Sequence, residues 1–500
     1  MFRFIFIILL CSFINACSVG PDYVKPSVQI PVSYKEKDKN WKIAKPQDDC
    51  HRGLWWQVFN DSELNILESQ LNISNQNIAA AKANYAQARA LADEARASYF
   101  PTINASAIIT RQKQGSSSSG SAGNTTTTGI TTVSTATSSG YTITTSHSLM
   151  LDASWEPDIW GNTRRSVEAS ESSAQASAAL LAVTRLSAQA SLAQFYFELR
   201  ALDTDQKLLD QNVIDNQKLL QLTKNRYVSG VAALSDIIQA ESQLETAQAQ
   251  AINNGINRAQ FEHAIAILIG EPPEMFSLPP SPLKNSPPPE IPVEIPSALL
   301  ERRPDIAGAE RQVAAANAKI GVAISAYYPT LNLSASGSLQ NQGLSNWFSL
   351  PSLVWSVGST LAETLFDGGL RTAVTKAAQA NYCAAVANYR QTVLSAFQEV
   401  EDNMAALRIL NSEYKVQNEA AANARLALKL VTYQYQAGVV AYSDVITAQI
   451  AAFTAEKTAA DLNGLRMTAA VGLIKALGGG WDGHSSQARL RRQFSHHQAT

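Results

Sequence analysis

Two long stretches without proline constrain this chain of 500 residues more than any other feature. The first continues as helical sequence for about 65 residues, from Gly161 to near Tyr227. The second runs in the same way from Gly369 to near Tyr435. At about 1.5 Å per residue, each stretch predicts a helical rod of roughly 100 Å. No globular domain needs such rods, so the sequence favours a tube or bundle of long helices that pack through apolar stripes.

The two halves of the chain follow one plan. An aromatic pair followed by Pro-Thr occurs at 99–102 and returns at 327–330. A motif with tyrosine and glycine at 226–230 returns at 434–438, in the same order along the chain. The sequence therefore indicates an internal duplication. Shorter helices are expected beside the rods, at about 61–98, 234–269, 297–326 and 441–477.

Composition marks the borders between these parts. A proline-rich stretch cannot continue a helix and predicts a stiff linker between the halves. A Ser/Thr/Gly tract at 112–142, found at this length only in the first half, predicts a long exposed loop. The expected parts begin with a signal peptide at 1–16 and a lipid-anchored segment at 17–60. The first repeat at 61–270, the linker at 271–296 and the second repeat at 297–480 follow, and a disordered tail at 481–500 ends the chain.

The N-terminus predicts a secretory signal. Arg3 precedes an apolar run at 4–13 that is too short to span a bilayer. The run closes where a small residue precedes Cys17, as in a bacterial lipobox, and we predict that Cys17 is acylated and holds the protein to the membrane surface. Ser18 after the cysteine favours sorting to the outer membrane. Asn15 fits a lipobox poorly, so an ordinary signal peptide with a fortuitous cysteine is the alternative.

Four segments alternate between apolar and polar residues, which is typical of strands with one wet face. The pattern is strict at 331–340 and recurs near 103–110, 149–155 and 353–357, so each half is expected to supply one hairpin. Aromatic residues near the strand ends suit an interfacial belt: Trp155, Trp160, Tyr327, Tyr328, Trp355 and Phe366. Four strands of this length cannot close a barrel, and open edges are not tolerated in hydrocarbon, so the chain must oligomerise. A soluble sandwich with half-exposed hairpins is the alternative.

Several motifs together resemble one family. They are Cys-Ser-Val-Gly-Pro-Asp-Tyr at 17–23, Trp-Trp-Gln-Val-Phe at 55–59, Leu-Leu-Glu-Arg-Arg-Pro-Asp-Ile at 299–306 and Ala-Leu-Gly-Gly-Gly-Trp at 476–481. The chain resembles, over nearly its whole mature length, the TolC-like outer-membrane efflux proteins. Within them it is similar to the lipoprotein (NodT-type) branch that serves resistance-nodulation-division pumps.

The resemblance implies a fold, a location and partners. The expected fold is mainly α with a membrane β-barrel, in which a homotrimer forms about twelve strands continued by a long α-helical periplasmic tube. The tube would meet a periplasmic membrane-fusion adaptor, which docks an inner-membrane resistance-nodulation-division pump. The chain is then a passive outer-membrane exit duct for drugs or other small molecules, anchored in outer-membrane lipid. A duct of a type I secretion or other exporter system is the alternative.

The resemblance also implies a periplasmic gate at the two turns that contain Gly230 and Gly438. Asp444 matches a family aspartate that faces the pore, and Asp236 matches a position that bonds to a tyrosine, here Tyr435. Helix capping is the alternative role for both aspartates and for the serines before them, Ser235 and Ser443.

This chain departs from the family pattern at two gate positions. Val440 stands where an arginine completes the lock, and Thr447 stands where a second pore aspartate can occur. The departures imply a looser gate with lower cation affinity.

An enzyme is not expected, because the chain has no His-Glu-x-x-His, no Gly-x-Ser-x-Gly and no phosphate-cradling glycine loop. Arginine, proline and aspartate at 302–305 are more simply helix-end chemistry than a catalytic group. A net charge of −2 disfavours nucleic acid as a partner. No cofactor or metal site is expected from five methionines and six histidines without clusters, and Cys50 and Cys383 are interpreted as incidental thiols.

Overall fold

The computed structural model describes residues 19–36, 54–115, 141–284, 287–291, 302–341 and 352–479. Cys17, Cys50 and the tail at 481–500 therefore lie outside the described residues. The chain divides into two compact units. One comprises Met1–Tyr23, Leu91–Ser170 and Ala316–Asn381, and the other comprises Val24–Ala90, Glu171–Ala315 and Tyr382–Thr500.

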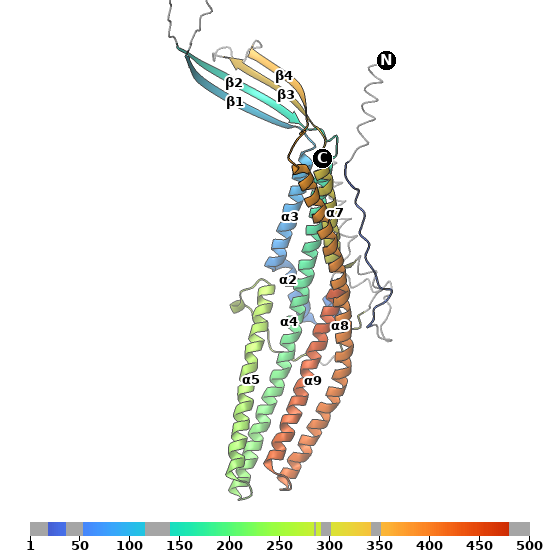
Figure 1. Cartoon of the computed structure of the whole chain (residues 1–500). Helices are drawn as coiled ribbons and strands as arrows, with labels where there is room; N and C mark the ends of the chain where they lie inside the picture. The colour runs from blue at the N-terminus through green and yellow to red at the C-terminus, as the bar shows by residue number, and fades with distance from the viewer. Residues whose placement is uncertain are drawn as a thin grey trace, which may run out of the picture. The chain divides into compact units, whose positions relative to one another are not determined.

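The first unit contains one antiparallel sheet of four strands in the order β1-β2-β3-β4 (Figure 1). The strands are β1 (Thr102–Gly115), β2 (Tyr141–Trp155), β3 (Thr330–Asn341) and β4 (Leu353–Ala362). β1 pairs with β2, and β3 pairs with β4, so each half of the chain supplies one hairpin as predicted. The two hairpins join through β2 and β3, where Trp155 lies opposite Leu333.

The predicted loop at 112–142 is wrong at both ends, since β2 already begins at Tyr141, and residues 116–140 lie outside the described residues. β1 continues to Gly115, and Gln112 and Lys113 pair with Thr144 and Ile143 of β2. The reason is that threonine and isoleucine on the facing strand favour extended backbone and extend the ladder into the polar tract.

Long helices dominate the chain. α4 (Asn162–Val228) and α8 (Leu370–Gln436) have 67 residues each, which confirms the two rods expected from the proline-free stretches. α5 (Leu234–Leu268) and α9 (Tyr442–Ala476) have 35 residues each. In the second unit, Figure 1 shows α5 beside α4 and α9 beside α8, and ion pairs Lys224–Glu241 and Arg425–Glu456 link these neighbours.

The first expected helix, at 61–98, is interrupted. It forms α2 (Ser62–Ser74) and α3 (Gln76–Ala97), which meet at Asn75 in extended backbone. The side chain of Asn75 accepts a hydrogen bond from the Ile78 amide at 3.0 Å and donates one to the Leu268 carbonyl at 2.7 Å. Asn75 thus caps α3 and ties it to the end of α5, which the local sequence does not reveal. The remaining elements are η2 (Trp55–Phe59), η3 (Pro273–Met275) and α7 (Pro304–Ser325).

The largest core of the second unit lies where η2 and α2 pack on the long helices. Its buried members include Trp56, Leu64, Leu71, Tyr196, Leu192, Ile265 and Val471. Among the described residues, no helix combines the length and hydrophobicity that a membrane crossing requires.

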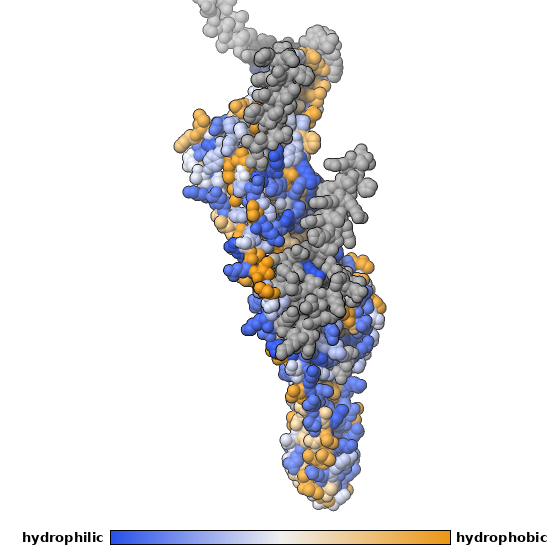
Figure 2. Space-filling view, turned by 90° about the vertical axis from the view of Figure 1, so that its right-hand side faces the viewer, coloured by the Kyte–Doolittle hydropathy of each residue, from blue (hydrophilic) through white to orange (hydrophobic). Residues whose placement is uncertain are grey.

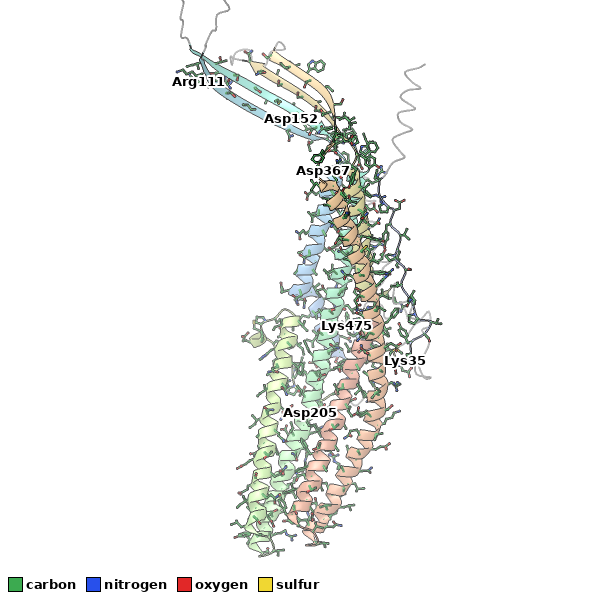
Figure 3. All side chains as sticks on the ribbon, viewed as in Figure 1. Lys35, Arg111, Asp152, Asp205, Asp367 and Lys475 are labelled. Atoms are coloured by element: carbon green, nitrogen blue, oxygen red, sulfur yellow. The ribbon has the colours of Figure 1, made fainter. Side chains whose placement is uncertain are left out.

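The N-terminal segment is bound at both of its described ends. In the second unit, the backbone amides of Lys35, which is labelled in Figure 3, and of Glu36 donate to the Glu401 carboxylate of α8. The distances are 2.7 and 3.0 Å. Tyr34 is buried there against Val400 and Met404. This part of the segment is therefore fastened to the side of α8.

In the first unit, residues 19–22 are held by Arg165 of α4, whose side chain is buried. Its guanidinium donates to Asp22 at 2.9 Å and to the carbonyls of Val19 and Gly20, each at 3.4 Å. Gly20 has a φ of +103°, and a Cβ there would lie 2.6 Å from the Gly321 Cα. Only glycine fits this close backbone approach.

Candidate functional site

The two predicted gate turns have matching backbones. Gly230 follows α4 with a φ of +74°, and Gly438 follows α8 with a φ of +80°. The amide of the next residue donates back to the helix end in each turn, from Val231 to the Arg226 carbonyl and from Val439 to the Gln434 carbonyl. These are left-handed helix ends of the kind that glycine stabilises.

Both predicted aspartates cap the helix that follows their turn. The Asp236 carboxylate accepts from the Ala233 amide at 3.3 Å, and the Asp444 carboxylate accepts from the Ala441 amide at 3.2 Å. An anionic side chain in a first helical turn also interacts favourably with the helix dipole. Capping therefore accounts for part of each aspartate's position, while the Asp444 side chain stays exposed.

Tyr435 is 3% exposed and lies between the two turns. Within the chain, its hydroxyl is 3.4 Å from Thr223 Oγ1, and its ring centroid is 5.6 Å from that of Tyr442. Among the described residues of one chain, this hydroxyl faces Thr223 rather than Asp236. The link between Asp236 and Tyr435 stays a prediction for the assembled channel.

Arg226 and Tyr442 belong to the site and were not predicted from the sequence. The Arg226 guanidinium lies 4.3 Å from the centroid of the Tyr435 ring and donates to the Tyr435 carbonyl. Burial raises the pKa of Tyr442 to about 12, with the charges of Tyr435 and Asp236 adding to the shift. The sequence held one signal: where the motif at 226–230 returns at 434–438, the charged Arg226 is replaced by the neutral Gln434.

A second polar contact joins α4 and α9 away from the turns. Lys457 donates to Asp205 and Asp461, each at 2.9 Å, and Asp205 is labelled in Figure 3. Burial raises the pKa of Asp205 to about 6, against the opposing effect of Lys457. Gln449 donates to Asn212 at 3.2 Å and continues the same contact line.

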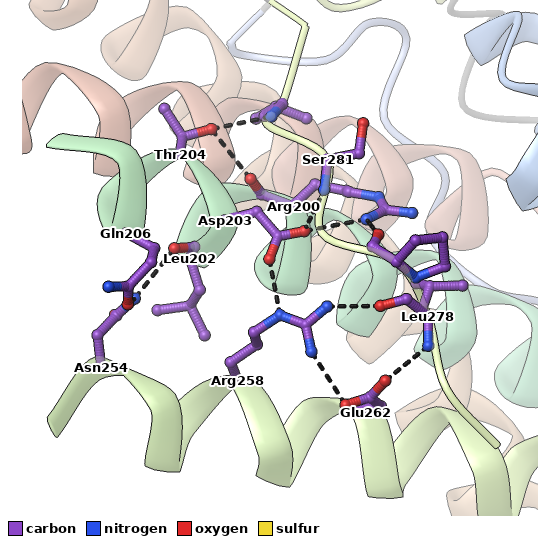
Figure 4. Close-up of polar contacts among 12 residues, drawn as sticks. Arg200, Leu202, Asp203, Thr204, Gln206, Asn254, Arg258, Glu262, Leu278 and Ser281 are labelled. Atoms are coloured by element: carbon purple, nitrogen blue, oxygen red, sulfur yellow. Dashed lines mark hydrogen bonds and ion pairs between the residues drawn. The ribbon is translucent and has the colours of Figure 1, made fainter. Parts of the chain in front are cut away.

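The described part of the linker is fixed to α4 and α5 (Figure 4). Asp203 binds Arg258 at 2.8 Å and accepts from the Ser281 amide at 2.9 Å. Glu262 accepts from the Leu278 amide at 2.6 Å and binds Arg258 at 3.0 Å. Charge-assisted bonds of this kind hold the extended part of the linker that follows η3.

Apolar side chains surround the two turns. Val228 is 85% exposed, Val231 is 64% exposed and Val439 is 73% exposed. Figure 2 shows orange patches among blue ones at this end of the helical unit. Exposed apolar groups in one place mark a surface suited to contact with another protein. Among the described residues, no group of three or more His, Cys, Asp or Glu side chains is placed to hold a metal ion.

The sequence model of the outer membrane efflux protein family matches residues 67–271 and 295–479. The chain therefore belongs to this family. It is an outer-membrane efflux protein and not an enzyme.

Relatives match over nearly the full length. The pyoverdine export outer membrane protein OpmQ of Pseudomonas aeruginosa is 29% identical over 475 residues, covering 95% of this chain and 96% of the relative. Outer membrane protein OprJ of the same species is 30% identical, with 95% of each chain covered. The cation efflux system protein CusC of Escherichia coli is 25% identical over 470 residues, covering 93% of this chain and 97% of the relative.

Solved structures share the fold. The outer-membrane channel OprN matches with a TM-score of 0.82 and 27% identity, covering 93% of this chain and all of that one. The open state of the Neisseria gonorrhoeae MtrE channel matches with a TM-score of 0.77 and 26% identity, covering 93% and 98%. The predicted family and the predicted fold, mainly α with a membrane β-barrel to which each chain gives four strands, are confirmed.

Proposed function

We propose that the chain is the exit duct of a tripartite efflux system. It would conduct drugs or other small molecules passively across the outer membrane, after an inner-membrane resistance-nodulation-division pump delivers them through a periplasmic adaptor. The names of its relatives, which specify pyoverdine export for OpmQ and cation efflux for CusC, support small solutes as the cargo. They favour this reading over a protein-secretion duct.

The main support for this proposal comes from the edges and the exposed side chains of the four-stranded sheet. Among the described residues, the outer strands of this sheet, β1 and β4, each have one edge that pairs with no other strand. Apolar side chains of these strands are exposed as well: Ile103 is 71% exposed, Val357 is 75% exposed and Leu361 is 69% exposed. Exposed apolar side chains are stable in contact with lipid, as on the outside of a membrane β-barrel. Unpaired strand edges are costly in hydrocarbon, so the edges of the sheet need partners. Three copies supply about twelve strands and remove every edge, so we propose a homotrimer.

The remaining proposals concern processing and gating. Cys17 would be acylated, and Asp236, Tyr435 and Asp444 would form the periplasmic gate at the turns of Gly230 and Gly438. The two repeats would span 61–270 and 297–480, with the linker at 271–296; the family matches at 67–271 and 295–479 support these limits.

Native mass spectrometry in detergent, combined with hydrogen exchange of β1 and β4, tests the proposed assembly. We expect a trimer in which the amides of both outer strands are protected by pairing with neighbouring copies. Trp56→Ala, which removes a buried side chain from the helical core and leaves the strands unaltered in sequence, serves as a control for general destabilisation. A stable monomer with protected β1 and β4 amides would contradict the proposal.

A further inference from the structure

Arg226 reaches from one helical hairpin to the other. We define the first hairpin as α4, α5 and their turn, and the second as α8, α9 and their turn. Arg226 lies in the last turn of α4, yet its Nη1 donates to the carbonyls of Tyr435 and Gln436, which end α8. Its guanidinium also covers the Tyr435 ring. Every one of these contacts lies in the second hairpin.

The electrostatics of the helix ends explain this placement. The last carbonyls of a helix have no partner within it, and the C-terminus carries a partial negative charge. α8 has no basic residue in its own last turn, whereas α4 has Arg226 there. The Arg226 guanidinium thus interacts favourably with the C-terminal ends of both α4 and α8. The buried Tyr435 ring adds a cation–π contact.

The duplication makes this arrangement one-sided. Gln434 occupies the position in the second repeat that Arg226 occupies in the first. Tyr227, the repeat counterpart of Tyr435, is 43% exposed, while Tyr435 is 3% exposed. The first hairpin therefore supplies the cation, and the second hairpin receives it.

We propose that Arg226 is a clasp that fastens the tip of the second hairpin to the first and keeps the mouth of the resting channel narrow. The gating part rests on the proposed duct function, whereas the clasp itself is a property of one chain. Arg226 is a positioning residue, since it acts through Tyr435 and the end of α8.

Lys224 provides a matched control. It lies two residues before Arg226, and its ammonium pairs with Glu241 of α5 at 2.9 Å, within the first hairpin. Arg226→Met and Lys224→Met each remove one positive charge from the same helical turn. Only the first of them removes a contact between hairpins.

The test measures hydrogen exchange over 432–446 and single-channel conductance in planar bilayers, on trimers verified by native mass spectrometry. Arg226→Met is expected to speed exchange of these amides by about tenfold, as for loss of roughly 1.4 kcal/mol of local stability, and to raise resting conductance. Lys224→Met should change neither. Arg226→Lys, which keeps the charge but loses the planar fork, should recover part of both.

Two outcomes separate the clasp from the gate. Equal exchange in Arg226→Met and Lys224→Met would overturn the clasp. Faster exchange confined to Arg226→Met, with conductance unchanged, would support the clasp and refute its part in gating.

Discussion

Glu68 is an unusual residue for the place it occupies. It lies on α2 beside Leu64 and Leu71, is fully buried, and has no hydrogen-bond partner for either carboxylate oxygen among the described residues. Burial raises its pKa to about 9, because desolvation penalises the ionised form. The folded chain therefore holds this proton at neutral pH, whereas the unfolded chain releases it near its ordinary value of 4.5.

The sign of the stability effect follows from this difference. Since the folded state binds more protons, the free energy of unfolding falls as pH rises from about 4.5 to about 9. Glu68→Met should remove this dependence and raise the free energy of unfolding by about 1–3 kcal/mol at pH 7. Melting temperatures measured from pH 5 to 9 check this. Glu94→Gln, at an exposed position of α3, is the control, and an unchanged pH slope in Glu68→Met would refute the argument.

The two roles of the Asp444 side chain, its negative charge and its capping of α9, can be tested separately. Asp444→Asn keeps an oxygen for the Ala441 amide but removes the charge, so block of channel current by divalent cations should weaken several-fold. Asp236→Asn makes the same change in the first turn and should leave the block intact. Equal block in the wild type and in Asp444→Asn would show that Asp444 acts only as a helix cap.

Tyr435→Phe tests the predicted bond between the Tyr435 hydroxyl and Asp236 in the assembled channel. If that bond narrows the channel mouth, its loss should raise the resting conductance.

At the scale of elements, prediction succeeded where local chemistry decides. The rods begin one residue after Gly161 and Gly369, where the proline-free stretches predicted their start. Alternation located all four strands. The break at Asn75 was missed, because it depends on a carbonyl 193 residues away in the sequence.

The N-terminal segment allows a prediction at the same scale. Gly20→Ala should release residues 19–23, because a Cβ at Gly20 would collide with Gly321 in a backbone conformation that alanine avoids. Limited proteolysis and hydrogen exchange of this segment provide the measurement. Gly255→Ala is the control, since a Cβ there meets nothing within 4 Å. Equal protection in both variants would show that the close approach to Gly321 is dispensable.

For the whole molecule, the motifs predicted the family and the fold, and the turn glycines located the two turns. Arg226 and Tyr442 escaped prediction, because their roles arise only when α4 of one repeat meets α8 and α9 of the other. The spacing of residues within one repeat does not predict contacts between the two repeats. The sequence thus predicted which segments build the site but not which side chains join them.

Acylation is a prediction about the mature molecule. Mass analysis of the N-terminus should find a lipid-modified Cys17 as the first residue. Cys17→Ser should still assemble trimers, because the strand edges rather than the lipid drive closure. An unmodified N-terminus at another residue would contradict the prediction.

The contacts of Arg165 with residues 19–22 also imply an order of events for the predicted processing before Cys17. Val19 is bonded to the Trp160 carbonyl, and two residues of extended chain reach at most about 7 Å, so a processing enzyme could not enclose the bond before Cys17 once residues 19–22 are seated. We therefore predict that cleavage comes first and docking of residues 19–22 second. We expect a chain that keeps its leader not to form the contacts of residues 19–22 with Arg165, so these contacts would distinguish processed chains from unprocessed ones.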